Sequence, residues 1–359
     1  MQPPRETLAE QETQRNDPPA DMGVQPAAPQ GQPPEEGALS ELIAEAMAAP
    51  ASVRPSHLRR FFKRQFDAMP SLAVLTAIGA ALLIGLATIF VRLSEAAPIA
   101  TAFHRFFLAG PFLITWMMYD NVKDAEARLP TRPAEYALMV LAGLFFALDL
   151  TCWHLSITMT SVVNAAMFNN MTAVFVPFLA WIIFGSRPTL AFTIGVLVAV
   201  CGAMILASQG GEEEGSGHLL GDLLAILSAV MFAGYILIKK YLRERYTAPT
   251  VMAWTSLPTM YFLALFAIFE DGNFFPTTLT GWFNLLALGL VVHVFGQGLM
   301  AYAMRHISAG FSAVVLLLGP IVASFIAWPL FDEPLNIVQA GGICVILCGI
   351  VIAQKSAQD

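Results

Sequence analysis

Ionisable side chains are rare in the long apolar stretches of this sequence, and the few that occur have distinct chemistry. Arg105, Asp149 and His293 each lie within a run of mostly apolar residues. An arginine can hold a carboxylate by two parallel hydrogen bonds, an aspartate can take up a proton, and a histidine can titrate near neutral pH. These residue types fit the binding of a solute carboxylate or the relay of a proton.

Arg105 and Asp149 lie at similar depths in consecutive runs. Arg105 is seven residues from the start of its run at Pro98, and Asp149 is eight residues before the end of its run at Ile157. If both runs are helical, the two residues lie roughly 10–12 Å from the same end. We expect an ion pair between them, because an unpaired charge inside a membrane is costly. The pair would serve a substrate or a proton, or it would be a permanent link between two helices.

Two further pairs share a helix face because their members are four residues apart. Trp153 follows Asp149 and could stack on an aromatic or cationic ligand, or it is a packing residue. Gln297 follows His293, which lies near the middle of its run. A histidine at that depth could relay a proton or bind a ligand, or it could be a neutral ring bonded to a neighbouring carbonyl.

Several weaker candidates complete the polar set. Three asparagines of one run cannot all face lipid, so we expect some to join helices and one to line a cavity: Asn164, Asn169 and Asn170. Gly319-Pro320 lies near the middle of another run, where a freed carbonyl could face a cavity or the chain could simply kink. His104 and His154 are the weakest candidates.

The elements that must position these residues are apolar helices. Hydrophobic residues make up 57% of the chain, only 13% are charged, and mean hydropathy is +0.64. Soluble domains carry about 25% charged residues, so we predict an all-α membrane protein with many spans. Its ten expected helices are 71–92, 98–119, 136–157, 162–184, 189–208, 219–238, 249–269, 282–304, 309–331 and 336–354.

The sequence repeats at an offset of 147 residues, which indicates an internal duplication. Identical pairs at that offset include Phe178/Phe325, Trp181/Trp328, Gly195/Gly342, Cys201/Cys348 and Gly202/Gly349. Lysine and arginine gather in alternate links and in both tails, so we place both termini in the cytoplasm. Each half has an odd number of expected helices, and the two halves should therefore be inverted relative to each other. Inverted repeats are typical of carriers.

The halves resemble two copies of the EamA unit of the drug/metabolite transporter superfamily. The resemblance rests on Ala97-Pro98 with His104-Arg105, on Ser156–Phe168, and on the segments Ala180–Pro188 and Ala327–Pro334. It implies two five-helix repeats and transport of a small organic molecule. One departure concerns Gly319-Pro320, which aligns with Thr172-Ala173. The first copy has Pro177 instead, so we expect its helix break one turn further along.

We divide the chain into a disordered cytoplasmic tail (1–67) with a basic-aromatic flank (54–66), a first repeat (70–208) and a second repeat (218–355). The flank either lies on anionic lipid or is an ordinary end of the first span. We expect a multi-pass protein of the bacterial plasma (inner) membrane. We expect it to export a small metabolite or drug-like solute, and to do so by alternating access. Import, exchange and a membrane-embedded enzyme are the alternatives.

No nucleotide, dinucleotide or zinc motif occurs, so we expect no cofactor, no metal and no catalytic residue. The expected partners are a small-molecule substrate and the lipid bilayer, without nucleic acid, and a homodimer is left open.

Overall fold

The computed structural model describes residues 71–123, 127–160, 162–208, 219–331 and 335–356. The tail and its basic-aromatic flank lie outside these ranges. In the first half the helices are α3 (Ser71–Gly85), α4 (Ala87–Arg92), α5 (Pro98–Lys123), α6 (Pro133–Met159), α7 (Val162–Asn170), α8 (Thr172–Phe184) and α9 (Leu190–Ala207). In the second half they are α10 (Leu219–Arg243), α11 (Ala248–Ala267), α12 (Leu279–Ala287), the π-helix η1 (Leu288–Gln297), α13 (Gly298–Ala303), α14 (Ala309–Val315), α15 (Leu318–Phe331) and α16 (Ile337–Ser356).

The predicted all-α membrane fold is confirmed for the described part of the chain, which contains no strand. Nine helical segments in these ranges are long and apolar enough to cross a membrane. The remaining expected span corresponds to α5, which has 26 residues but also carries His104, Arg105, Asp120 and Lys123. The count of ten and the cytoplasmic side of the termini stay predictions.

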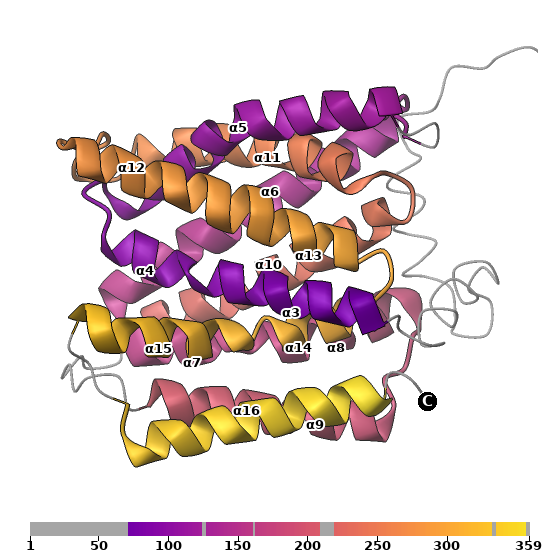
Figure 1. Cartoon of the computed structure of the whole chain (residues 1–359), viewed down its shortest axis with the longest axis vertical. Helices are drawn as coiled ribbons and strands as arrows, with labels where there is room; N and C mark the ends of the chain where they lie inside the picture. The colour runs from indigo at the N-terminus through magenta and orange to yellow at the C-terminus, as the bar shows by residue number, and fades with distance from the viewer. Residues whose placement is uncertain (1–70, 124–126, 161, 209–218, 332–334, 357–359) are drawn as a thin grey trace, which may run out of the picture. The chain divides into compact units, whose positions relative to one another are not determined.

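Contacts between the two halves follow the sequence repeat. The equivalent helices α9 and α16 lie side by side at one edge of the bundle, and α5 and its equivalent α11 lie at the opposite edge (Figure 1). Helix α6 packs on α10. Their equivalents in the other halves, η1 for α6 and α3 for α10, also pack on each other. The α9–α16 and α5–α11 contacts each join two equivalent helices, whereas the α6–α10 and α3–η1 contacts are equivalent to each other. A pseudo-twofold relationship between the halves requires this pattern.

Repeated glycines bring α9 and α16 together. A Cβ atom on Gly195 would lie 2.9 Å from the carbonyl oxygen of Gly349, and one on Gly202 would lie 2.8 Å from that of Gly342. Earlier residues of α9 thus meet later residues of α16, so the two helices are antiparallel. Because Gly195 is equivalent to Gly342 and Gly202 to Gly349, the two contacts exchange under the repeat. Equivalent helices that pack antiparallel in this way belong to inverted copies.

Two spans are interrupted at nearly equivalent places. The ninth breaks between α14 and α15, where Pro320 has no N–H for the carbonyl of Leu316, which instead accepts from Gly319 at 2.9 Å. The fourth breaks at Met171, so the expected break near Pro177 is wrong. Thr172 explains the position, because its hydroxyl donates to the Asn169 carbonyl at 2.8 Å and competes with the helical ladder.

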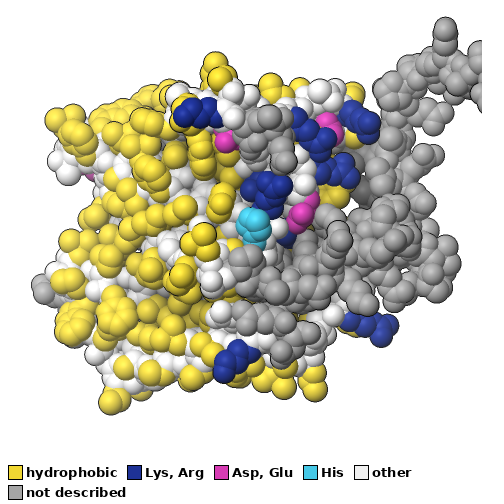
Figure 2. Space-filling model, turned by 45° about the vertical axis from the view of Figure 1, so that its right-hand side comes forward, with side chains coloured by type: hydrophobic (Ala, Val, Ile, Leu, Met, Phe, Trp, Pro, Cys, Tyr) yellow, Lys and Arg dark blue, Asp and Glu magenta, His cyan; other side chains and the backbone are white. Residues whose placement is uncertain are grey.

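Basic side chains gather at one end of the bundle, beside a broad hydrophobic surface (Figure 2). This end holds the start of α3 and the end of α16 (Figure 1). The same end carries the C-terminus of α10 and the link before α14, and it is called the basic end below.

Candidate functional site

Asp149 is held by α10 rather than by Arg105. Its carboxylate accepts a hydrogen bond from the Ser228 hydroxyl at 2.6 Å, and Asn169 donates to the same hydroxyl oxygen at 2.9 Å. The network joins α6, α7 and α10, and Asp149 is only 5% exposed. The described structure contains no direct ion pair between Arg105 and Asp149, so the expected pair is wrong as a contact.

Arg105 is buried without a compensating carboxylate in contact. Its side chain is 7% exposed, and its Nε has no hydrogen-bond partner among the described residues. The guanidinium carbon lies 5.8 Å from the centre of the Phe106 ring. A buried arginine with an unused donor is poised to bind an anionic group, because guanidinium pairs well with carboxylate.

His293 lies within the π-helix η1 and is buried. Its Nε2 is 2.8 Å from the Ser256 hydroxyl of α11, whereas Nδ1 has no partner among the described residues. The ring packs 4.3 Å from the Phe106 ring. A π-helix widens the turn and is rare, and such segments often occur at functional sites. Here it directs His293 and Gln297 into the interior, where both are buried.

Gln297 accepts a hydrogen bond from a lysine that lies just beyond the expected end of the sixth span, at residue 238. Lys239 donates to the Gln297 side-chain oxygen at 2.9 Å, and its Nζ lies 5.1 Å from the centre of the Tyr235 ring. The expected helix end at residue 238 is wrong, because α10 continues to Arg243 and buries Lys239 to 1% exposure. Three separate hydrogen-bonded groups and Arg105, which bonds to none of them, make up the polar side chains of the interior, and we call them together the central polar cluster: Arg105, Asp149, Asn169, Ser228, Lys239, Ser256, His293 and Gln297.

Two carboxylates join the halves at the end of the bundle opposite the basic one. Glu95 follows α4, and both Thr277 and Thr278 donate to it through backbone N–H groups, at 2.8 and 3.0 Å, and through their hydroxyls. Glu270 follows α11 and accepts from the N–H groups of Ile99 and Ala100 at 2.9 and 3.1 Å.

Each carboxylate thus caps a helix of the other half, where the positive end of the dipole favours it. We call these contacts the carboxylate clasp. The hydrogen bonds from Thr278 and then Thr277 lower the pKa of Glu95 from 4.5 to about 2.

A model of the EamA-like transporter family matches residues 71–208 and again residues 219–354. The chain belongs to this family. The two matches correspond to the two inverted copies. A solved crystal structure has the same fold, with a TM-score of 0.67 and 18% sequence identity over 80% of this chain and 99% of that one.

Relatives of this EamA transporter are also named as transporters. Uncharacterized transporter YetK of Bacillus subtilis is 25% identical over 81% of this chain and 87% of its own length. The pseudopaline exporter CntI of Pseudomonas aeruginosa is 28% identical over 67% of this chain and 82% of its own. The protein is therefore a membrane transporter of the EamA family.

The other predicted site residues of the EamA protein lie outside the hydrogen bonds of the cluster. His154 is buried and packs 5.0 Å from the Trp153 ring. His104 bonds the Ala100 carbonyl at 2.7 Å and packs among aromatic rings near the clasp: Phe103, Phe274, Phe275 and Trp282. Asn170 and Pro320 are half-buried at the two helix breaks. Asn164 belongs to α7, and its side chain lies outside the described residues.

Three members of the cluster were not predicted: Ser228, Lys239 and Ser256. Two serines in apolar spans carry little signal, since serine is common at helix contacts in membranes. Lys239 has a stronger sequence signal than the two serines. It follows Tyr235 by one helical turn and shares its face, and this was obscured by placing the helix end one residue before it.

Proposed function

We propose that this transporter exports a small organic metabolite that carries a carboxylate, across the bacterial plasma membrane and by alternating access. The central polar cluster is the substrate site. Arg105 binds the carboxylate, while Asp149 and His293 hold or release a proton.

The observation that carries the proposal is a set of buried ionisable side chains drawn from both repeats. Arg105 and Asp149 come from the first repeat, and Lys239 and His293 come from the second. With Arg105 and Lys239 charged, the cluster has two positive groups and one negative group. Buried charges require partners, and a solute carboxylate between Arg105 and Lys239 would supply the missing negative charge.

Unequal repeats support alternating access. The third span is a continuous α-helix, α6, whereas its equivalent in the second repeat contains η1. Two copies of one unit that hold different conformations could exchange them, which would open a central site first to one side and then to the other. Because η1 carries His293 and Gln297, its rewinding to an α-helix would move both side chains.

The carboxylate clasp supplies the closure that such a cycle needs. It ties the loop after α4 to the start of α12, and the loop after α11 to the start of α5. We infer that the clasp is the gate on the side opposite the basic end and that it breaks when the site opens there. We propose export because a relative is named as an exporter, the pseudopaline exporter CntI. Import would use the same site in the opposite direction, and exchange would use it in both directions.

Transport by proteoliposomes tests the proposal. The full-length protein is reconstituted and offered a panel of labelled metabolites, with and without a pH gradient. We expect uptake of carboxylate-bearing solutes, a loss of at least tenfold in Arg105→Gln, and partial retention in Arg105→Lys. Selective transport of solutes that lack a carboxylate, or full activity of Arg105→Gln, would refute the assigned substrate class. Transport that is insensitive to the imposed gradient would point to exchange or facilitated diffusion.

A further inference from the structure

A groove separate from the central polar cluster opens on the lateral surface between α8 and α9. Its volume is about 330 Å³. The buried side chains of Phe192 and Val196 form its floor, and the exposed side chains of Phe178, Trp181 and Leu197 form its rim. The volume falls at the lower end of the range for small-molecule sites, roughly 300–1,000 Å³.

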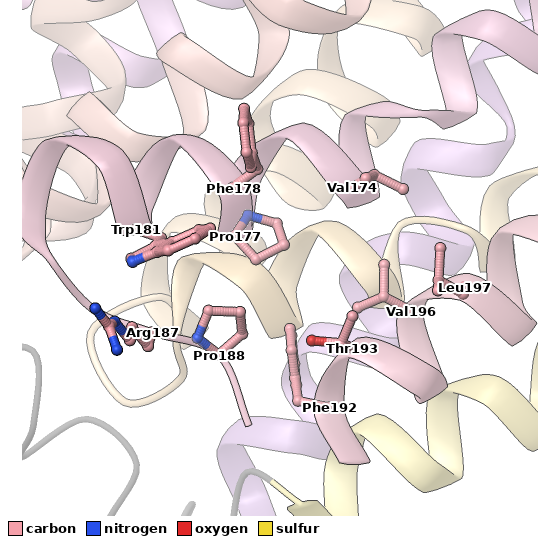
Figure 3. Close-up of a pocket in the computed structure, with 10 residues that line it drawn as sticks. All are labelled: Val174, Pro177, Phe178, Trp181, Arg187, Pro188, Phe192, Thr193, Val196 and Leu197. Atoms are coloured by element: carbon pink, nitrogen blue, oxygen red, sulfur yellow. The ribbon is translucent and has the colours of Figure 1, made fainter. Parts of the chain in front are cut away.

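One cation stands at one end of this groove. Figure 3 shows Arg187, Pro188 and Trp181 together at that end, and Val174 and Leu197 at the other. The guanidinium carbon of Arg187 lies 6.0 Å from the centre of the Trp181 ring. The groove is therefore apolar along its length and positively charged at a single end.

The local backbone fixes the position of Arg187. Gly185 follows the last residue of α8 and has a φ of 70°, which favours glycine, and its N–H donates to the Trp181 carbonyl at 2.8 Å. Ser186 donates from its hydroxyl to the Ala180 carbonyl at 3.1 Å. The turn leads Arg187 and Pro188 along the groove mouth, so the cation is part of a defined site.

In a membrane this arrangement matches one ligand. The groove lies among exposed apolar side chains that face acyl chains, and tryptophan is typical of the level of the lipid head groups. Arginine pairs readily with phosphate, and no carboxylate in the described part of the chain pairs with Arg187. The predicted cytoplasmic leaflet on this side is the one rich in anionic lipid.

We propose that the groove between α8 and α9 binds one anionic phospholipid, with its phosphate at Arg187 and an acyl chain over Phe192 and Val196. The equivalent link of the second repeat contains Asp332 and Glu333. A link with two carboxylates does not favour an anionic head group, so the site is assigned to the first repeat alone.

Brominated lipids test the site, because bromine quenches nearby tryptophan. The full chain is reconstituted in phosphatidylcholine vesicles that contain brominated phosphatidylglycerol or, in a parallel set, brominated phosphatidylcholine. Subtraction of the Trp181→Phe signal isolates Trp181 from the other five tryptophans, since the chain has six. One basic residue near the surface gives about fivefold preference for an anionic lipid, and we expect that preference at Trp181.

Matched variants separate the groove from the general charge of the basic end. Arg187→Gln should reduce the preference toward unity, whereas Arg132→Gln, an exposed arginine of the basic end outside the groove, should keep it. Thr193→Phe, which fills the groove, should reduce quenching by both brominated lipids.

Four outcomes would overturn the proposal. Equal quenching by the two lipids, or an unchanged preference in Arg187→Gln, would remove the anionic lipid. Protection of Trp181 from both lipids in a dimeric protein would make a second copy of the chain the occupant. Loss of transport in Arg187→Gln with the lipid preference intact would make the groove a solute route.

Discussion

Phe146 and His293 occupy equivalent positions of the two repeats, 147 residues apart, and their ring centroids lie 6.4 Å apart. The two residues therefore face each other close to the pseudo-twofold axis. One position holds an apolar ring, while the other holds a titratable one. Near this axis the two backbone positions are equivalent, but their side chains differ in chemistry.

His293→Phe would give both repeats the same ring. The loss of the imidazole leaves the Ser256 hydroxyl without its partner, which should destabilise the fold by about 1–3 kcal/mol. Adding Ser256→Ala should restore thermal stability. If His293 serves transport, the double variant should remain at least tenfold impaired in proteoliposomes. Recovery of transport together with stability would reduce His293 to a structural role.

Asp149→Asn keeps the shape of the side chain and can still accept from Ser228, but it cannot exchange a proton. We expect transport to lose the part of its pH dependence that comes from Asp149, while His293 keeps its own. Asp222→Asn is the matched control, because Asp222 accepts a comparable hydrogen bond from Thr160 at 2.7 Å near the opposite end of α10 from Lys239. A pH profile in Asp149→Asn that matches the wild type would exclude Asp149 from proton coupling.

Lys239 and Lys240 are adjacent and both buried, yet they should behave differently. Lys240 donates to Glu244 and to the Met304 carbonyl, each at 2.5 Å, so Lys240→Met should lower the melting temperature. Lys239 instead contacts Gln297 in the cluster, and Lys239→Met should impair transport with a smaller loss of stability. Melting curves and initial rates measured on both variants distinguish the two roles. Equal transport losses at equal stability would contradict the assignment.

The Glu95 half of the carboxylate clasp should depend on pH only in acid. The pKa of Glu95 is depressed, so its contribution is complete above the ordinary value of 4.5 and is lost as the pH falls through about 2. We expect Glu95→Gln to weaken the clasp across the neutral range. In a chain whose native cysteines are replaced, Thr101→Cys, buried behind the clasp, should then react faster with an impermeant maleimide. An unchanged labelling rate in Glu95→Gln would argue against a gate.

Glycine contacts between α9 and α16 can be tested by single methyl groups. A Cβ atom at Gly349 would lie 2.3 Å from the backbone nitrogen of Ala199, whereas one at Gly341 would meet nothing within 4 Å. Gly349→Ala should destabilise the protein by about 1–3 kcal/mol. Gly341→Ala should stabilise it by up to about 1 kcal/mol, because alanine favours the helix. Thermal unfolding in detergent measures both changes.

The break at Met171 shows how a sequence argument can find an interruption and misplace it. Pro177 has the stronger sequence signal, since proline removes a helical hydrogen bond. The helix instead breaks at Met171, and the hydroxyl of the next residue, Thr172, contacts the Asn169 carbonyl and also the Ala229 carbonyl of α10 at 3.3 Å. That second contact exists only because α10 packs there.

By itself, the sequence determined the helical membrane fold, the duplication and the types of side chain buried in it. Hydrophobic run length and a fixed offset carry this information, because they depend only on the order of residues. Tertiary structure decided which side chains meet. Counting residues along each helix predicts that Arg105 and Asp149 lie at the same depth. A helix also turns about 100° per residue, and the rotation of α6 relative to α10 directs Asp149 toward Ser228. The same packing enclosed Lys239, which the sequence had left at a helix end.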